Sequence, residues 1–194
     1  MDNICQIFFG ELSRYLPNVA EAFGPPANPV VLDEMNKMVN NRLPKDFLNF
    51  YSIVNGESDY VGSILGFELM SIENIMGEYK FFEKYPKKFI SFQKGKIKEG
   101  QYNSMWLPIA SDGGGSFLAM DLAPDTEGNI GQIITLDRES NISYVIAASF
   151  RELLLDVIPR EFANGNFNVN DEEEPEVFEW IDGHYFNHIK ERFL

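Results

Sequence analysis

The 194-residue chain has a single cysteine, Cys5, and two histidines, His184 and His188. One cysteine cannot form an intrachain disulfide, and it leaves no cysteine cluster for zinc or redox chemistry. The histidines stand four residues apart, as two metal ligands on one helix face would, but no glutamate follows the first and Gly183 precedes it. The sequence therefore predicts surface histidines, no metal site and no cofactor.

Long apolar runs are also absent. No apolar stretch approaches the roughly 18 residues that suggest a membrane span. The N-terminus, Met1-Asp2-Asn3, lacks the basic region that opens a secretory signal. We expect a cytoplasmic protein that does not enter a membrane.

Basic residues are few, because 16 Lys and Arg stand against 30 Asp and Glu, which gives a formal charge of −14. This charge repels phosphate backbones and anionic membranes beyond about one Debye length, so we expect no direct nucleic-acid binding. A negative surface speeds the encounter with a cationic protein. Acidity also serves solubility alone, and charge by itself leaves both interpretations open.

The chain does contain enough apolar material for a core. Hydrophobic residues make up 44% of it, including 17 Phe, and this composition is typical of a globular domain. The length favours one α+β domain with an appendage. We place the domain at residues 1–162 and an acidic C-terminal extension at residues 163–194.

The first half of the chain shows the spacing of helices. Apolar residues recur at helical intervals over residues 4–16, from 30 to about 40, and again over 44–56, where a proline opens the segment and Asn-Gly closes it. Residues 64–69 predict a strand, and Ser71 is a plausible N-cap for a fourth helix.

From residue 105 onward the apolar period becomes that of a sheet. Four short apolar runs, separated by turn residues, predict an antiparallel meander; they are residues 105–110, 116–121, 130–136 and 142–147. Pro108 predicts an edge or a bulge in its strand. Ser149 and Glu152 form a capping box for a following helix. We expect a central antiparallel sheet of about four to six strands, packed against the N-terminal helices and a helix that follows the last strand.

The C-terminal extension is acidic. Six acids fall within the nine residues from Asp171 to Glu179, which predicts a linker followed by a solvated acidic surface. Residues 177–194 keep apolar side chains at mostly helical intervals, so we expect a closing helix there.

Three stretches, taken in order, are more specific than these periodicities. They are Leu43–Tyr51 with Asn55-Gly56, Trp106–Asp121 with its Asp-Gly-Gly-Gly turn, and Gly131–Ile134 leading to Ser149-Phe150 and Leu153-Leu154. Together they resemble the SUKH superfamily, which includes Smi/Knr-type regulators of yeast cell-wall synthesis and many bacterial immunity proteins. The resemblance covers roughly residues 28–160 and implies a SUKH-like α+β fold.

The resemblance implies a function based on binding another protein. The expected function is that of an immunity protein, which binds and neutralises a cognate toxin domain, and the acidity suits a basic toxin such as a nuclease. The alternative is a non-enzymatic regulatory scaffold similar to the cell-wall glucan-synthesis regulators. A hydrolase would need converging carboxylates or a metal site, and the sequence offers no such constellation, so we expect no catalytic residues.

The candidate partner-binding residues are acids that a basic protein would meet. They are Asp112 and Asp121 near the predicted hairpin turn, and Asp171, Glu172, Glu173, Glu174 and Glu176 in the extension. The alternative for every one of them is a merely solvated side chain.

One cluster opposes the global charge. Residues 80–98 contain seven lysines and a single acid, Glu83. This cluster could bind an acidic partner, bind the protein's own acidic extension, or be a solvated helix end and loop.

Overall fold

The computed structural model describes residues 4–170, 172, 176–181 and 183–193. Its helices are α1 (Ile4–Leu12), η1 (Val19–Ala22), α2 (Pro29–Met38), α3 (Lys45–Tyr51), α4 (Ile72–Lys84), α5 (Phe150–Glu152), η2 (Leu153–Val157), α6 (Ile158–Ala163) and α7 (Tyr185–Phe193). Its strands are β1 (Glu68–Leu69), β2 (Lys88–Ser91), β3 (Gly100–Gln101), β4 (Trp106–Ser111), β5 (Phe117–Asp121), β6 (Gln132–Leu136), β7 (Ile142–Ser143), β8 (Val145–Ala147), β9 (Phe167–Asn170) and β10 (Val177–Trp180).

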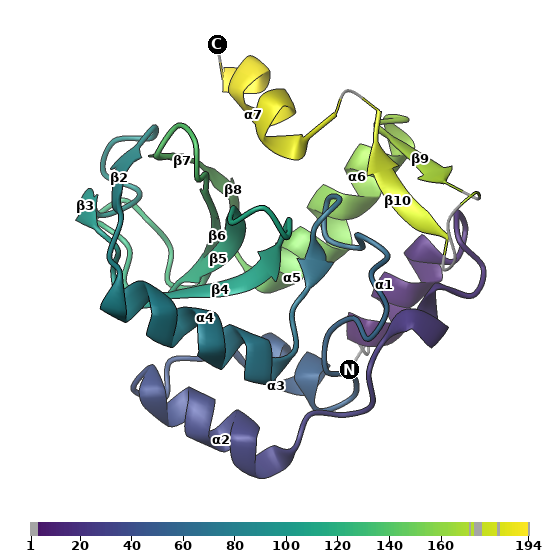
Figure 1. Ribbon diagram of the computed structural model, residues 1–194, viewed down its shortest axis with the longest axis horizontal. Helices are drawn as coiled ribbons and strands as arrows, with labels where there is room; N and C mark the ends of the chain where they lie inside the picture. The colour runs from purple at the N-terminus through teal and green to yellow at the C-terminus, as the bar shows by residue number, and fades with distance from the viewer. Residues whose placement is uncertain (1–3, 171, 173–175, 182, 194) are drawn as a thin grey trace.

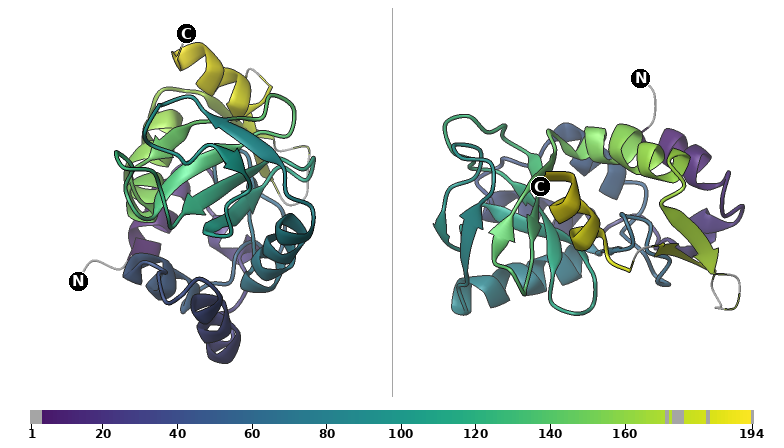
Figure 2. Two further views of the ribbon diagram at one scale, coloured as in Figure 1. Left: turned by 90° about the vertical axis from the view of Figure 1, so that its left-hand side faces the viewer. Right: turned by 90° about the horizontal axis from the view of Figure 1, so that it is seen from above.

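Five strands form a central antiparallel sheet in the order β1-β4-β5-β6-β8. Helices α2, α3 and α4 lie along one side of this sheet, and the segment from α5 to α6 runs behind it (Figure 1). Two smaller sheets, β3-β2-β7 and β9-β10, lie at opposite ends of the molecule (Figures 1 and 2). The predicted α+β class, with an antiparallel sheet and a helix after the strands, is confirmed.

Helices begin where short polar side chains can cap them. The side chains of Asn28, Ser71 and Ser149 each accept a hydrogen bond from a backbone N–H two or three residues further on, at 2.9, 3.2 and 3.1 Å. A cap of this kind stabilises a helix by about 1 kcal/mol because the first N–H groups have no partner inside the helix. The predicted N-caps at Ser71 and Ser149 are confirmed.

Aromatic rings join the N-terminal helices to the helix that follows the sheet. Phe47 and Phe50 of α3 are fully buried, and their ring centroids lie 5.2 and 5.5 Å from that of Phe150 in α5. Trp106 of β4 is also fully buried. Strands β5 and β6 are buried at every position, so the sheet lies inside the molecule with both faces covered.

The hairpin between β4 and β5 follows its sequence signals. The register shifts between Pro108 and Ala110, which confirms the predicted irregularity at the proline. Gly113 and Gly115 in the turn adopt φ values of 70° and 96°, a region that side chains with a Cβ rarely occupy.

The helical segment from α5 to α6 widens in its middle. In η2 the N–H of Ile158 donates to the carbonyl of Leu153, five residues earlier, as in a π-helix. Pro159 follows immediately. A proline has no N–H, and its ring meets the carbonyl four residues back in a regular α-helix. The wide turn therefore lets the helix continue through the proline.

Two segments of the first hundred residues differ from the prediction. Residues 64–69 are mostly a loop, and only β1 at their end is a strand, because Leu65 and Gly66 adopt left-handed φ values of 59° and 84°. The lysine-rich region contains β2, which pairs with β7 through Ile90 and Ile142. That pairing is non-local, so no short-range pattern could predict it.

The C-terminal extension begins with a hairpin, where the sequence predicts a linker and the start of a helix. Strands β9 and β10 pair antiparallel, and α7 starts only after Gly183, which adopts a φ of 94°. Phe178 and Trp180 are buried while Glu179 is exposed, as in a half-buried strand. Five buried residues of the extension, Phe178, Trp180, Tyr185, Phe186 and Ile189, belong to the same hydrophobic core as the rest of the chain. The domain boundary at residue 162 stays a prediction.

Candidate partner-binding site

The predicted site residues do not gather in one place. Asp112 lies in the β4–β5 turn and Asp121 at the end of β5, while Glu172 and Glu176 are exposed residues of the extension. Asp171, Glu173 and Glu174 lie outside the described residues. Glu176 lines a groove that the sequence did not predict.

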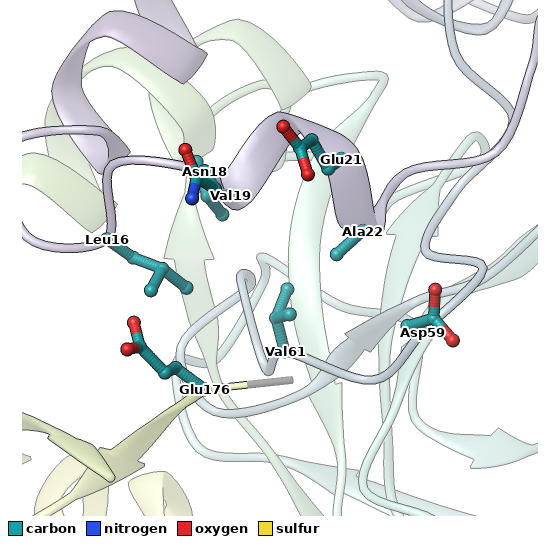
Figure 3. A pocket seen from close by; sticks show the side chains of 8 residues that line it. All are labelled: Leu16, Asn18, Val19, Glu21, Ala22, Asp59, Val61 and Glu176. Atoms are coloured by element: carbon teal, nitrogen blue, oxygen red, sulfur yellow. The ribbon is translucent and has the colours of Figure 1, made fainter. Parts of the chain in front are cut away.

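This groove has a volume of about 550 Å³ and lies between three segments that are distant in sequence. Figure 3 shows side chains from η1 and the turn before it, from the loop over residues 57–63, and from the residue that leads into β10. The lining residues are Leu16, Asn18, Val19, Glu21, Ala22, Asp59, Val61 and Glu176. We call it the acid-rimmed groove.

The groove combines an apolar floor with a negative rim. Its four apolar lining residues are almost completely buried. The carboxylates of Glu21, Asp59 and Glu176 are exposed and lie on different sides of the groove (Figure 3). None of the three forms an ion pair with a described residue, and no basic residue is among those that line the groove. The groove therefore suits an apolar side chain flanked by positive charge.

The loop that supplies Asp59 and Val61 is shaped by a buried carboxylate. Glu57 is 7% exposed. One oxygen, Oε2, accepts hydrogen bonds from the N–H groups of Val61 (2.7 Å) and Gly62 (3.1 Å). The other, Oε1, accepts from the N–H of Ser63 (3.0 Å), the hydroxyl of Ser63 (2.6 Å) and the N–H of Leu69 (3.0 Å). Glu57 is thus the acceptor around which the loop closes.

The charge state of Glu57 follows from these partners. Burial raises the pKa of this carboxyl, while the hydrogen bonds from Ser63, Leu69 and Val61 lower it. Four of the five partners are backbone N–H groups, which can only donate, and the fifth is the hydroxyl of Ser63. Burial has the larger effect, so the pKa of Glu57 is raised overall, although the N–H groups favour its ionised form.

Backbone hydrogen bonds hold the three walls of the groove together. The carbonyl of Ala22 accepts from the N–H groups of Ser58 (2.8 Å) and Asp59 (3.2 Å), which fixes η1 against the loop. The N–H of Phe178 donates to the carbonyl of Val61 (2.9 Å), which fixes β10 on the other side. The groove is therefore built into the fold.

Asp121 is buried between two strands of the central sheet. It has no exposed surface, and its carboxylate accepts from the N–H of Ala123 (3.1 Å) and from the side-chain amide of Gln132 (3.0 Å). Burial raises its pKa to about 6, although these hydrogen bonds act in the opposite direction. A side chain enclosed in this way joins β5 to β6 and offers no surface to a partner, contrary to the role predicted for it.

Asp112 shapes the hairpin turn and contacts the C-terminal extension. Its Oδ1 accepts from the N–H groups of Gly114 (2.7 Å) and Ser116 (2.9 Å), and its Oδ2 lies 3.3 Å from Nε2 of His184. Burial acts to raise the pKa of Asp112, but His184 and the two N–H groups outweigh it and hold the pKa below its usual value. Part of this carboxylate is therefore already occupied within the chain.

Helix α7 is held against the domain by further charged contacts. Lys190 Nζ lies 2.9 Å from Asp137 Oδ2. Glu161, which is 2% exposed, faces Arg192 at 3.4 Å and His188 at 3.8 Å. Both histidines are therefore half-buried and face carboxylates, which differs from the predicted surface position. These contacts join the extension to the hairpin ends and to α6.

Metal-binding clusters and membrane-spanning helices are both absent from the described residues. No group of three or more His, Cys, Asp or Glu residues there could hold a metal ion. No helix in the part of the chain that the structure describes is both long enough and apolar enough to cross a membrane.

Comparison with known proteins identifies the fold's family. The model of the SMI1/KNR4 family (SUKH-1) matches residues 26–156. Among curated relatives, the cell wall biosynthesis/cell cycle regulator smi1 of Schizosaccharomyces pombe is 24% identical over 162 residues, which are 73% of this chain and 32% of that protein. A KNR4/SMI1 homolog of Yarrowia lipolytica is 36% identical over 105 residues, 53% of this chain and 15% of that protein.

The cell wall assembly regulator SMI1 of Saccharomyces cerevisiae is 36% identical over 73 residues, 36% of this chain and 14% of its own length. The chain thus spans about a third or less of these relatives. The family match covers more than half of the chain and includes the three stretches that resemble the SUKH superfamily. This chain belongs to the SMI1/KNR4 (SUKH-1) family.

Proposed function

We propose that this chain is a non-enzymatic regulatory scaffold domain that binds a basic segment of a partner protein in the acid-rimmed groove. The observation that carries the proposal is the groove itself, in which carboxylates that form no ion pair with a described residue surround an apolar floor. The names of the relatives, which describe regulators of cell-wall biosynthesis and assembly, support regulation over toxin neutralisation.

The chemistry of the groove specifies the partner segment. An aliphatic side chain that packs on the exposed edges of Leu16 and Ala22 would contribute about 1.5–3 kcal/mol if fully buried. Lys or Arg residues beside it would each add about 0.2–1 kcal/mol at the exposed rim. The apolar anchor therefore supplies most of the affinity, while the charges supply orientation, encounter rate and salt dependence.

The groove lies partly outside the region that the family model matches. Asp59 and Val61 fall within residues 26–156, whereas η1 and Glu176 fall outside it. The partner segment would therefore contact both the region that the family model matches and parts that lie outside it.

Neutralising the groove acids is expected to weaken binding of a basic peptide. The variant combines Glu21→Gln, Asp59→Asn and Glu176→Gln, and the probe is a fluorescein-labelled Lys/Arg peptide with one central leucine. We expect the dissociation constant to rise about 3- to 100-fold, because three favourable pairs are lost. Fluorescence anisotropy between about 0.05 and 0.3 M salt would also show a weaker salt dependence in the variant.

A matched control removes the same charge elsewhere. Glu34→Gln, Glu99→Gln and Glu191→Gln change three exposed acids that do not line the groove. This control should change the dissociation constant less than about twofold. Equal weakening by both triple variants would mean that only net charge matters, and the groove would lose its assignment.

The immunity interpretation uses the same surface, since the acidic rim would also suit a basic toxin such as a nuclease. The two functions differ in what the partner does. If co-expression of the chain rescues the growth of cells that make a toxic partner, and the groove variant does not rescue them, then the chain is an immunity protein and the scaffold proposal is wrong. Partner binding without toxicity supports the scaffold.

A further inference from the structure

The lysine cluster occupies one end of the molecule. Residues 80–98 hold seven of the chain's sixteen basic residues and only one of its thirty acids, Glu83. They form the end of α4, strand β2 and the loop after it, at the end of the molecule opposite β9 and β10 (Figures 1 and 2). The described acids of the β9–β10 hairpin therefore do not cover these lysines.

Two aromatic rings are exposed among the lysines. Phe81 and Tyr85 are 54% and 55% exposed, and their ring centroids lie 5.0 Å apart. Lys84 Nζ lies 5.2 Å from the centroid of Tyr85. Lys80 precedes Lys84 by four residues, as Phe81 precedes Tyr85, so the two rows lie next to each other on the helix surface. We call Lys80, Phe81, Lys84 and Tyr85 the lysine–aromatic surface.

The core does not use these rings. The inner face of α4 has its own aromatics, Tyr79 and Phe82, which are buried, and Phe82 stacks on Tyr102 at 4.5 Å. The outer pair exposes apolar area without packing against the sheet. Adjacent exposed apolar groups rimmed by polar residues often mark an interaction site.

The positive charge of this surface is not neutralised locally. Neither Lys80 nor Lys84 forms an ion pair with a described residue, although Lys37 and Lys190 elsewhere do. Two acids of the same helix lie nearby in sequence, Glu78 and Glu83, and Glu83 is hydrogen-bonded to the hydroxyl of Tyr79. Acids at the far end are screened, since the Debye length is about 8 Å at physiological salt. From residue 78 to residue 88 four lysines stand against two glutamates, so the charge of this segment is positive despite the formal charge of −14.

We propose that the lysine–aromatic surface is a second docking site, which takes an acidic protein segment with one aromatic or aliphatic side chain. Carboxylates of the segment contact Lys80 and Lys84, and its apolar side chain packs on Phe81 and Tyr85. A short acidic segment fits better than a long polyanion, because a polyanion extending beyond the surface meets the negative remainder of the molecule. This site is separate from the acid-rimmed groove and of opposite charge.

The test uses the full chain and a fluorescein-labelled peptide of glutamates with one central phenylalanine. Saturable binding is expected by fluorescence anisotropy at about 0.15 M salt. Lys80→Glu with Lys84→Glu should raise the dissociation constant at least about tenfold. Lys94→Glu with Lys98→Glu makes the same charge change on exposed lysines away from the rings and should raise it less than about threefold.

A second variant tests the rings without changing charge. Phe81→Ala with Tyr85→Ala should weaken binding of the same peptide about fivefold or more while the circular dichroism stays unchanged, because both side chains are exposed. The triple variant of the acid-rimmed groove should bind the acidic peptide as well as the unaltered protein does. The proposal for this surface and the proposal for the groove can therefore be contradicted independently of each other.

Four outcomes would overturn the proposal. The first is no saturable binding, and the second is equal weakening by the two lysine variants. The third is tighter binding of single-stranded DNA than of the acidic peptide at the same site, which would assign the surface to a polyanion. The fourth is concentration-dependent sedimentation of the protein alone that is lost in Lys80→Glu with Lys84→Glu, which would make a second copy of this chain the occupant.

Discussion

Replacing Glu57 with alanine is expected to lower the free energy of unfolding by more than about 4 kcal/mol, because five hydrogen-bond donors lose their acceptor at once. Each buried donor left without a partner costs about 1–3 kcal/mol, and water entering the space restores part of this. Urea unfolding followed by tryptophan fluorescence measures the change.

The matched control for this prediction is Glu34→Ala on the exposed side of α2. It should change the free energy of unfolding by less than about 0.5 kcal/mol. A loss below about 1 kcal/mol in Glu57→Ala would show that the loop does not depend on this carboxylate.

A milder change separates folding from the shape of the groove. Glu57→Gln keeps the size of the side chain but replaces one acceptor oxygen by an amide that faces donors. Where this variant stays folded, hydrogen exchange should become faster in residues 58–69, and binding of the basic peptide in the groove should weaken. Unchanged exchange would contradict the role assigned to Glu57.

The second large effect concerns Asp121 and pH. Its pKa is raised from 3.8 to about 6 by burial, so between these values the folded state keeps a proton that the unfolded state releases. The free energy of unfolding therefore falls as the pH rises from about 4 to 6, by up to roughly 3 kcal/mol from this group. Asp121→Asn removes this contribution. The free energy of unfolding of the variant minus that of the unaltered protein should increase from about pH 4 to pH 6 and stay constant above pH 6.

Asp112 provides a control of opposite sign. Its pKa is lowered in the folded protein, so its contribution to stability is present above about pH 3.9 and is lost as the pH falls below that value. Asp112→Asn should therefore change stability mainly above that pH, with a plateau at neutral pH. Parallel stability–pH curves for Asp121→Asn and the unaltered protein would contradict the buried, partly protonated state of Asp121.

The elements that the sequence predicts well are those with local signals. Ser71 and Ser149 cap helices because their side chains reach N–H groups within the same turn. Pro108 disturbs its strand because it lacks a donor. In each case the cause lies within a few residues of the effect, which is why pattern and structure agree.

The features that the sequence does not predict depend on distant neighbours. Alternation along β5 indicates a strand but not that both of its faces are covered, so Asp121 was expected at the surface. Glu57 differs from the other acids only in following Asn55-Gly56, and its donors come from a loop that has no periodicity.

The candidate site also contains some residues that the sequence indicates and others that only the fold reveals. The run of acids in the extension indicated Glu176 by composition, but Glu21 and Asp59 are isolated acids in segments with no distinctive pattern. Only the folded chain brings the three carboxylates around one apolar floor.

The wide turn in η2 constrains how this part of the chain can vary in length. Phe150, Leu154, Ile158 and Phe162 are all buried at a spacing of four. In regular winding such a row would rotate around the helix by about 40° per step, and the wider turn cancels part of that drift. Loss of a single residue here would restore regular winding and turn the end of the helix outward. Glu161 would then move away from Arg192 and His188, so the deletion would remove two of the charged contacts that hold the C-terminal helix.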